Sequence, residues 1–186
     1  QASAWLDRFP DQPLTVNVNL SRRQLDRGDL AAKLVRILDE LDLPPASLQL
    51  EVTESMVMRN PEAARALLLD LRRLGLGLAI DDFGTGYSSL SYLHRFPADT
   101  LKIDRSFVCR MESSPEDKII ETIMALGRKL GMKLVAEGVE TERQCHLLRA
   151  AGCDLAQGYL FSPPLPAEEA TRLLANRAPL GAGGLP

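Results

Sequence analysis

Polar side chains occur near the carboxyl end of each of six predicted strands, and their types could do chemistry together. They are Asn19, Glu51, Asp81, Lys102, Glu137 and Gln157, with Asp82 directly after Asp81. Four of these seven residues are carboxylates, which do not easily stay ionised at close range without cations. Carboxylate and amide oxygens are hard ligands that suit Mg²⁺ or Mn²⁺. Adjacent aspartates at one strand end can bridge or split between two ions, and Lys102 would offset charge, so the pattern points to hydrolysis of a phosphate ester.

The same residues also allow a plainer interpretation. A single Asp or Glu at a strand end more often caps a helix or lies in a solvated loop. Lys102 and Asp104 could form a surface pair, which contributes little to stability. Six polar residues in step on six strands are harder to obtain by chance, but the pattern alone leaves both interpretations open.

The elements that must position these residues alternate between strand and helix along the chain. Strands are predicted at 14–20, 48–53, 78–82, 100–104, 133–137 and 154–160; helices are predicted at 21–41, 62–74, 88–94, 115–130, 141–150 and 167–175. Six βα units in a row predict an α/β fold with a parallel sheet. In a barrel of such units the carboxyl ends of the strands point into the active site. No glycine-rich dinucleotide element follows the first strand.

The size of the chain suggests most of a barrel. Eight βα units usually take about 250 residues, whereas this chain has 186. It begins at Gln1 in a stretch typical of the end of an amphipathic helix, with Trp5 and Phe9 at helical spacing. We therefore expect a (β/α)8 barrel of the TIM type with about six units present and the first strands missing. This domain is predicted over 1–176, followed by a flexible Gly/Pro-rich tail over 177–186.

Composition excludes several classes of protein. The net charge is −3 and the pI is near 5.5, which argues against a binder of nucleic-acid polymers. No apolar run approaches the roughly 20 residues of a membrane helix, and no secretory leader is recognisable. Cys109, Cys145 and Cys153 show no CxxC spacing and are predicted to be reduced thiols in a cytosolic protein. Two histidines are too few for a histidine-based metal site.

Six stretches carry a family resemblance. They are VNVNLS (16–21), LEVTES (50–55), IDDFGTGYSSL (80–90), LKIDRSFV (101–108), VAEGVET (135–141) and QGYLFSPPLP (157–166). Together they resemble the EAL-domain phosphodiesterases, which hydrolyse cyclic di-GMP to linear pGpG with two Mg²⁺ or Mn²⁺ ions. The Glu-Ala-Leu tripeptide that names the family occurs nowhere in this sequence. Because all the other motifs are present, we expect that tripeptide to lie before Gln1.

The resemblance implies a role for each matching residue. Asn19, Glu51 and Asp81 correspond to ligands of the first ion, and Asp81 would bridge to a second ion beside Asp82. Lys102 corresponds to the lysine that contacts the hydrolytic water. Glu137 corresponds to a general base or a partner of the second metal. Glu140 and Gln157 correspond to further active-site positions, with Gln157 near the substrate.

A glycine-containing loop over Phe83–Tyr87 (FGTGY) follows the third strand. From its pattern it could be an ordinary turn or a mobile loop over the site. The resemblance implies that Glu54 anchors this loop, which includes Phe83, Gly84, Thr85 and Gly86, and that the loop couples dimerisation to metal and substrate binding. A homodimer is therefore expected.

Three hypotheses follow for the function. The first is a cyclic di-GMP phosphodiesterase, and the second is an inactive receptor or scaffold that binds cyclic di-GMP. The third is a non-functional fragment with open sheet edges. The resemblance also implies upstream sensory or diguanylate cyclase domains, and a cytoplasmic location in a parent protein that those domains could anchor to a membrane.

Overall fold

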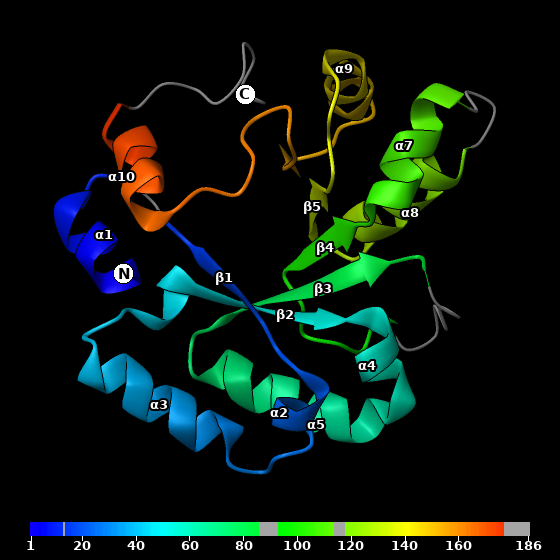
Figure 1. Ribbon diagram of the computed structural model, residues 1–186. Helices are drawn as coiled ribbons and strands as arrows, with labels where there is room; N and C mark the ends of the chain where they lie inside the picture. Colours follow the sequence, from blue (N-terminus) through cyan, green and yellow to red (C-terminus); the bar gives the residue numbers. More distant parts are fainter. Residues whose placement is uncertain (13, 86–92, 114–117, 177–186) are drawn as a thin grey trace. The chain divides into compact units, whose positions relative to one another are not determined.

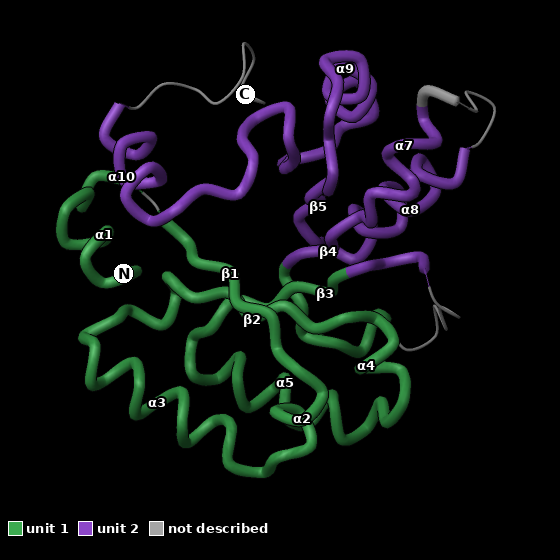
Figure 2. The backbone as a smooth tube through the Cα atoms, viewed as in Figure 1, with its two compact units in different colours: residues 1–81, 86–99 green, residues 82–85, 100–186 purple. Residues whose placement is uncertain are grey.

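The computed structural model describes residues 1–12, 14–85, 93–113 and 118–176. The chain forms two compact units, shown in different colours in Figure 2. The first unit contains residues 1–81 and 86–99, and the second contains residues 82–85 and 100–186. The boundary falls inside a strand, between Asp81 and Asp82, so these two neighbouring aspartates belong to different units.

The first unit is built on parallel strands in the order β1 (Val16–Asn19), β2 (Leu48–Thr53) and β3 (Gly77–Phe83). Val18 lies beside Leu50, which lies beside Leu78, and the next level of the ladder joins Asn19, Glu51 and Ala79. Side chains alternate between the two faces of a strand. The apolar residues therefore share one face, and Asn19 and Glu51 share the other, as the sequence pattern predicts.

The first unit also contains helices. They are α1 (Ala2–Arg8), α2 (Arg22–Leu25), α3 (Leu30–Glu40), the 3-10 helix η1 (Pro45–Ser47), α4 (Glu54–Arg59) and α5 (Pro61–Arg73). Figure 1 shows α3 and α5 on the same side of β1 and β2. Leu68 and Leu71 of α5 are fully buried, as are Leu50 and Leu78 of the strands. This apolar layer fixes the strands from one side and leaves their polar face for the site.

The helix predicted over 21–41 is wrong as a single element. Ser21 does begin a helix, because its backbone N–H donates to Gln24 Oε1 at 2.8 Å in a capping box. The helix ends at Leu25, however, and α3 starts again at Leu30. Gly28 lies in the gap, and glycine is among the weakest helix formers. Asp26 and Asp29 flank it, and short polar side chains compete with helical hydrogen bonds.

The second unit repeats the parallel arrangement in the order β4 (Thr100–Ile103), β5 (Lys133–Ala136) and β6 (Leu155–Ala156). Lys102 lies beside Val135, and Val135 lies beside Leu155. The pairing continues past the strand ends, where Glu137 N donates to Ile103 O at 3.0 Å and Gln157 N donates to Ala136 O at 2.8 Å. By alternation, Lys102, Glu137 and Gln157 therefore leave their strands on the same face.

Helices α7 (Arg105–Ser113), α8 (Ile119–Lys129), α9 (Glu142–Ala150) and α10 (Ala167–Asn176) belong to the second unit. Helix α8 packs on β4 and β5, with α7 beside it (Figure 1). The contact depends on Gly127, because a Cβ atom at this position would lie 2.4 Å from Leu134 Cδ2. This glycine lets the helix approach the strands closely.

Other predicted elements differ from the structure or lie outside the described residues. The strand predicted over 154–160 is wrong in length, since β6 has two residues. Just beyond it, the backbone of Gly158 packs against that of Val139. Most of the helix predicted over 88–94, the start of the helix predicted over 115–130, and the predicted tail over 177–186 lie outside the described residues. Helices α4 and α7 were not predicted.

Candidate functional site

Three side chains from β4, β5 and β6 meet at the carboxyl ends of these strands. Lys102 Nζ lies 2.7 Å from Glu137 Oε1, and Gln157 Nε2 donates a hydrogen bond to the same oxygen at 2.6 Å. The Lys102 side chain is 5% exposed and that of Glu137 is 16% exposed. The two donors hold the Glu137 carboxylate in one orientation. The structure thus brings these three residues together at the strand ends, while their roles stay predictions.

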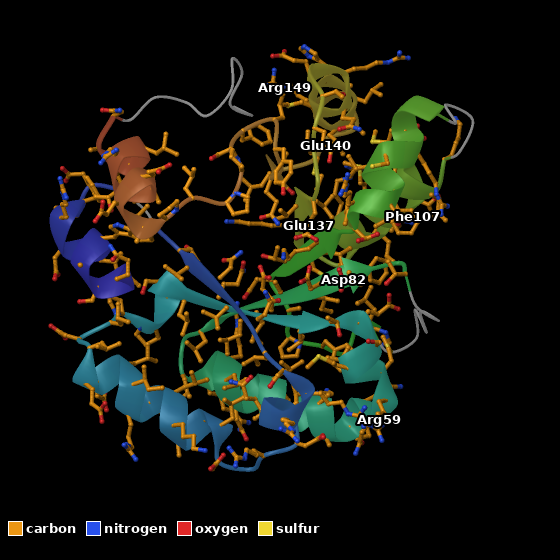
Figure 3. All side chains as sticks on the ribbon, in the orientation of Figure 1. Arg59, Asp82, Phe107, Glu137, Glu140 and Arg149 are labelled. Carbon is orange, nitrogen blue, oxygen red and sulfur yellow. The ribbon has the colours of Figure 1, made fainter. Side chains whose placement is uncertain are left out.

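Carboxylates form a group beside this lysine. Asp82 and Glu137, both in the second unit, offer oxygens within 4.8 Å of each other, and Asp81, bonded to Asp82, offers a third. Carboxylates this close repel one another unless cations lie between them. Oxygen ligands in such a group fit a hard divalent cation such as Mg²⁺, Mn²⁺ or Ca²⁺. The donor set therefore suits the metal site that the sequence predicts. Asp82 and Glu137 are labelled in Figure 3.

The backbone at Asp82 has an unusual conformation. Its φ is +52°, in the left-handed region that residues other than glycine rarely adopt. A tight turn follows, in which Thr85 Oγ1 and Thr85 N both donate to Asp82 O, at 2.8 and 3.3 Å. Such conformations persist when the surroundings impose them, and they cluster at functional sites. Asp82, whose carboxylate lies within 4.8 Å of that of Glu137, is held in this conformation.

The loop predicted over 83–87 is described for its first three residues, and Gly86 and Tyr87 lie outside the described part. Gly84 has a φ of +94° and packs on the ring of Phe107, the third residue of α7. A Cβ atom at Gly84 would come within 2.7 Å of that ring. The guanidinium of Arg110 also lies over the Phe107 ring, 5.6 Å from its centroid. The start of the loop is therefore joined to α7.

A short segment after β5, Glu137–Glu140, carries two of the predicted site residues. Glu140 Oε1 lies 2.6 Å from a guanidinium nitrogen of Arg105, the first residue of α7. Between the two glutamates, Gly138 adopts a φ of +67°. Helix α9 begins directly afterwards with a capping box, in which Gln144 Oε1 accepts from the backbone N–H groups of Glu140 and Thr141.

Predicted ligands also come together in the first unit. Asn19 and Glu51 are direct neighbours on β1 and β2. Glu51 is 5% exposed, and its Oε1 accepts a hydrogen bond from Asn17 Nδ2 at 2.8 Å. Glu54 is also buried, at the first turn of α4. The structure thus pairs Asn19 with Glu51 in register, whereas the ligand role of either residue stays a prediction.

A surface cavity of about 500 Å³ lies in the first unit, between α2, α4 and α5. Its lining residues are Arg22, Leu25, Asp26, Met56, Arg59, Asn60, Ala63 and Ala64. None of the carboxylates predicted as metal ligands lines this cavity, although Arg59 is visible at the end of α4 in Figure 3. The chemistry predicted from the strand ends therefore does not depend on it.

The three cysteines are free thiols. Cys153 is buried between strands, and its Sγ donates to Leu134 O at 3.5 Å and to Leu155 O at 3.2 Å. Burial raises the pKa of this thiol from 9.0 to about 11, because the thiolate would lose its hydration. Cys153 is therefore an inert packing residue at neutral pH.

Comparison with known proteins identifies the family. Residues 1–164 match the sequence model of the EAL domain. The chain belongs to the EAL domain family. Two relatives come from Pseudomonas aeruginosa. The cyclic di-GMP phosphodiesterase NbdA is 49% identical over 82% of this chain, and the bifunctional diguanylate cyclase/cyclic di-GMP phosphodiesterase MucR is 45% identical over 96% of it. The chain spans 20% of NbdA and 26% of MucR.

Solved EAL structures establish the fold class. The PaMucR phosphodiesterase in complex with c-di-GMP matches with a TM-score of 0.86 and 45% identity, over 90% of this chain and 68% of that one. A manganese and cyclic di-GMP complex of Klebsiella pneumoniae BlrP1 matches with a TM-score of 0.77 and 35% identity, over 88% of this chain and 42% of that one. The predicted fold class, about six units of a (β/α)8 barrel, is thereby confirmed.

Two residues that contact the predicted site were not singled out from the sequence. Asn17 shares the polar face of β1 with Asn19, so the alternation of that strand contained the signal. Arg105 lies within the stretch LKIDRSFV, but nothing local indicates its contact with Glu140, 35 residues further along the EAL domain.

Among the described residues, no helix is both long and apolar enough to cross a membrane.

Proposed function

We propose that the protein is a phosphodiesterase that hydrolyses cyclic di-GMP to linear pGpG, with two divalent cations, Mg²⁺ or Mn²⁺. One observation carries the proposal: the carboxylates of Asp82 and Glu137 lie within 4.8 Å of each other, with Lys102 held against Glu137, in a member of the EAL family. Relatives named as cyclic di-GMP phosphodiesterases, and solved EAL structures with cyclic di-GMP and manganese, support it.

The metal ligands are proposed from both strand sets. Asn19, Glu51 and Asp81 would hold one cation, and Asp81 with Asp82 would hold the second. Bound divalent cations supply neutralisation of phosphate charge and activation of water in such sites. The hard oxygen character of these side chains supports Mg²⁺ or Mn²⁺ over a soft metal.

The remaining residues are proposed to orient the reactants. The Lys102 ammonium would hold the attacking water, and Glu137 would accept its proton or act as a partner of the second cation. As water adds to phosphorus, the bond from phosphorus to the 3′-oxygen breaks, and the departing oxygen takes up a proton. Gln157 and Glu140 would face the substrate.

Regulation and setting are also part of the proposal. Glu54 would anchor the loop that starts at Phe83, and a homodimer would act through that loop. The contact of Gly84 with Phe107 gives the loop a route to α7. The relatives are several times longer than this chain, and MucR is named as bifunctional, which supports sensory or diguanylate cyclase domains beside this one. Free thiols support a cytoplasmic location.

The test is turnover of cyclic di-GMP by the full-length protein with Mg²⁺ and then with Mn²⁺, followed by chromatography of pGpG. We expect pGpG from the wild type and essentially none from Glu137→Gln. Asp70→Asn is the matched control, because Asp70 forms an exposed pair with Arg73 on α5. Binding of the nucleotide by calorimetry without turnover would instead make the protein a receptor. If the protein neither binds nor hydrolyses cyclic di-GMP, both functions are refuted.

A further inference from the structure

Arg105 contacts the Glu137–Glu140 segment in two ways. Its guanidinium pairs with Glu140 Oε1 at 2.6 Å. Its aliphatic stem lies against the backbone of Gly138, where an added Cβ atom would be 2.3–2.7 Å from the Cβ, Cγ and Cδ atoms of the arginine. The Arg105 side chain therefore packs on Gly138 in the middle of the segment and forms an ion pair with Glu140 at its end.

The rest of the segment is held by hydrogen bonds to its neighbours. At its start, Glu137 N donates to Ile103 O, the last residue of β4. In its middle, Val139 N donates to Gln157 O and Val139 O accepts from Leu160 N, both at 3.0 Å. At its end, Glu140 N donates to Gln144 Oε1 at 2.8 Å. The Arg105 contacts can be removed by a side-chain substitution outside the strands, as can the hydrogen bond to Gln144.

Arg105 lies close in the chain to Lys102, the residue that pairs with Glu137. Arg105 follows β4 by one residue, and β4 carries Lys102. Asp104 fixes the start of α7, because Asp104 Oδ1 accepts from Ser106 N at 2.9 Å. Lys102 on β4 and Arg105 at the start of α7 are thus three residues apart in the chain, and both contact the segment that begins at Glu137.

We infer that Arg105 is a positioning residue, which orients the Glu137 carboxylate toward Lys102 by clamping Gly138 and Glu140. This inference rests on the proposed phosphodiesterase function for its effect on catalysis. The role requires glycine at position 138, both for its φ of +67° and for the space that the arginine stem occupies. Misplacement of a reacting group by about 1 Å costs on the order of 100-fold in rate.

The experiment compares Arg105→Ala, Arg105→Lys and Arg36→Ala in the full-length protein. Arg36 forms an exposed pair with Glu40 on α3 and is the matched control for loss of a surface ion pair. For Arg105→Ala we expect kcat for cyclic di-GMP to fall at least tenfold, with KM within about twofold. Arg105→Lys should restore part of kcat, because lysine keeps a stem and a charge. Arg36→Ala should behave as wild type.

A second readout does not depend on activity. Hydrogen exchange of the Val139 and Glu140 amides should become faster in Arg105→Ala, with amides of α8 and β5 unchanged. A rise in KM at constant kcat would overturn the inference in favour of direct substrate contact by Arg105. Unchanged exchange at both amides would also overturn it. The wild type could bind cyclic di-GMP without turnover while Arg105→Ala still shows faster exchange at Val139 and Glu140. In that case the proposed function fails, and the positioning of the Glu137–Glu140 segment by Arg105 stands.

Discussion

Lys102 Nζ lies 2.7 Å from Glu137 Oε1, and this pair joins the carboxyl ends of β4 and β5. Both side chains are withdrawn from solvent, and the carboxylate of Asp82 lies within 4.8 Å of that of Glu137. The lysine therefore offsets part of the negative charge of these carboxylates. Removing one partner of a buried pair leaves an uncompensated charge.

Lys102→Met should therefore destabilise the metal-free protein by about 3–5 kcal/mol, the usual cost of breaking a buried pair. Thermal unfolding in EDTA measures the loss. Saturating Mn²⁺ should recover part of it, because a divalent cation neutralises the same carboxylates. Lys129→Met, at the exposed end of α8, is the control. It should change neither the stability in EDTA nor the stabilisation by Mn²⁺. An unfolding temperature equal to that of the wild type in EDTA would contradict the role of Lys102.

For Asp82 the expected change in stability without metal is opposite to that for Lys102. Asp82→Asn removes a charge that lies within 4.8 Å of other carboxylates. Asparagine also tolerates the left-handed conformation that this position requires. We expect this variant to be at least as stable as the wild type in EDTA, and to lose most of the stabilisation by Mn²⁺. That stabilisation should be about 2.7 kcal/mol at 100 times the Kd in the wild type.

The control for Asp82→Asn is Asp70→Asn, which also replaces an aspartate by its amide but in an exposed pair on α5. Its stabilisation by Mn²⁺ should equal that of the wild type. A full Mn²⁺ response in Asp82→Asn would show that Asp82 is not a ligand.

Strand alternation predicted the faces of the site residues on the strands that hold Asn19, Glu51 and Lys102. Apolar residues at Val18, Leu50 and Leu78 identify one face, so the polar residues between them must share the other. The strands of Glu137 and Gln157 are apolar on both faces, so alternation in the sequence did not assign their side chains, and the register of the structure places them beside Lys102. The period of two is a property of the strand itself, so it needs no tertiary information.

Contacts between distant segments could not be predicted in this way. The packing of Arg105 on Gly138 joins residues that follow different strands. The helices α4 and α7 escaped prediction because each starts within one residue of a strand end, with no Gly or Pro between them. The split of the predicted helix 21–41 depended on Gly28, which a helix tolerates in other settings.

Gly84 provides a prediction about packing. An alanine here would meet the Phe107 ring at 2.7 Å and would also adopt a φ of +94°. Gly131 has a similar φ of +71°, with nothing within 4 Å of an added Cβ atom. Gly131→Ala should therefore show the backbone cost alone, about 1–2 kcal/mol. Gly84→Ala should cost a further 1–3 kcal/mol or so from overpacking.

Chemical denaturation of the two variants gives the comparison. Equal losses for Gly84→Ala and Gly131→Ala would mean that the ring of Phe107 moves aside freely, and that the start of the loop is not coupled to α7. A larger loss for Gly84→Ala is the result expected from the structure.

Cys153 gives a pH dependence whose sign follows from burial. In the folded protein the thiol has a pKa of about 11, raised from 9.0 by desolvation. Between these two values the unfolded chain releases a proton that the folded protein keeps, so alkaline pH favours unfolding. The contribution is fully present below pH 9 and is lost as the pH rises toward 11. Its size is about 2–3 kcal/mol, at about 1.4 kcal/mol for each pKa unit.

Cys153→Ala removes this titration and leaves the other alkaline groups in place. The free energy of unfolding, measured from pH 8 to pH 11.5 for both proteins, should therefore fall less steeply in the variant. The difference between the two curves isolates Cys153, because lysines and tyrosines titrate alike in both proteins. Labelling with a thiol reagent at pH 8 should likewise modify the exposed Cys109 well before Cys153. Parallel curves over this pH range would mean that the Cys153 thiol ionises in the folded protein as readily as in the unfolded chain.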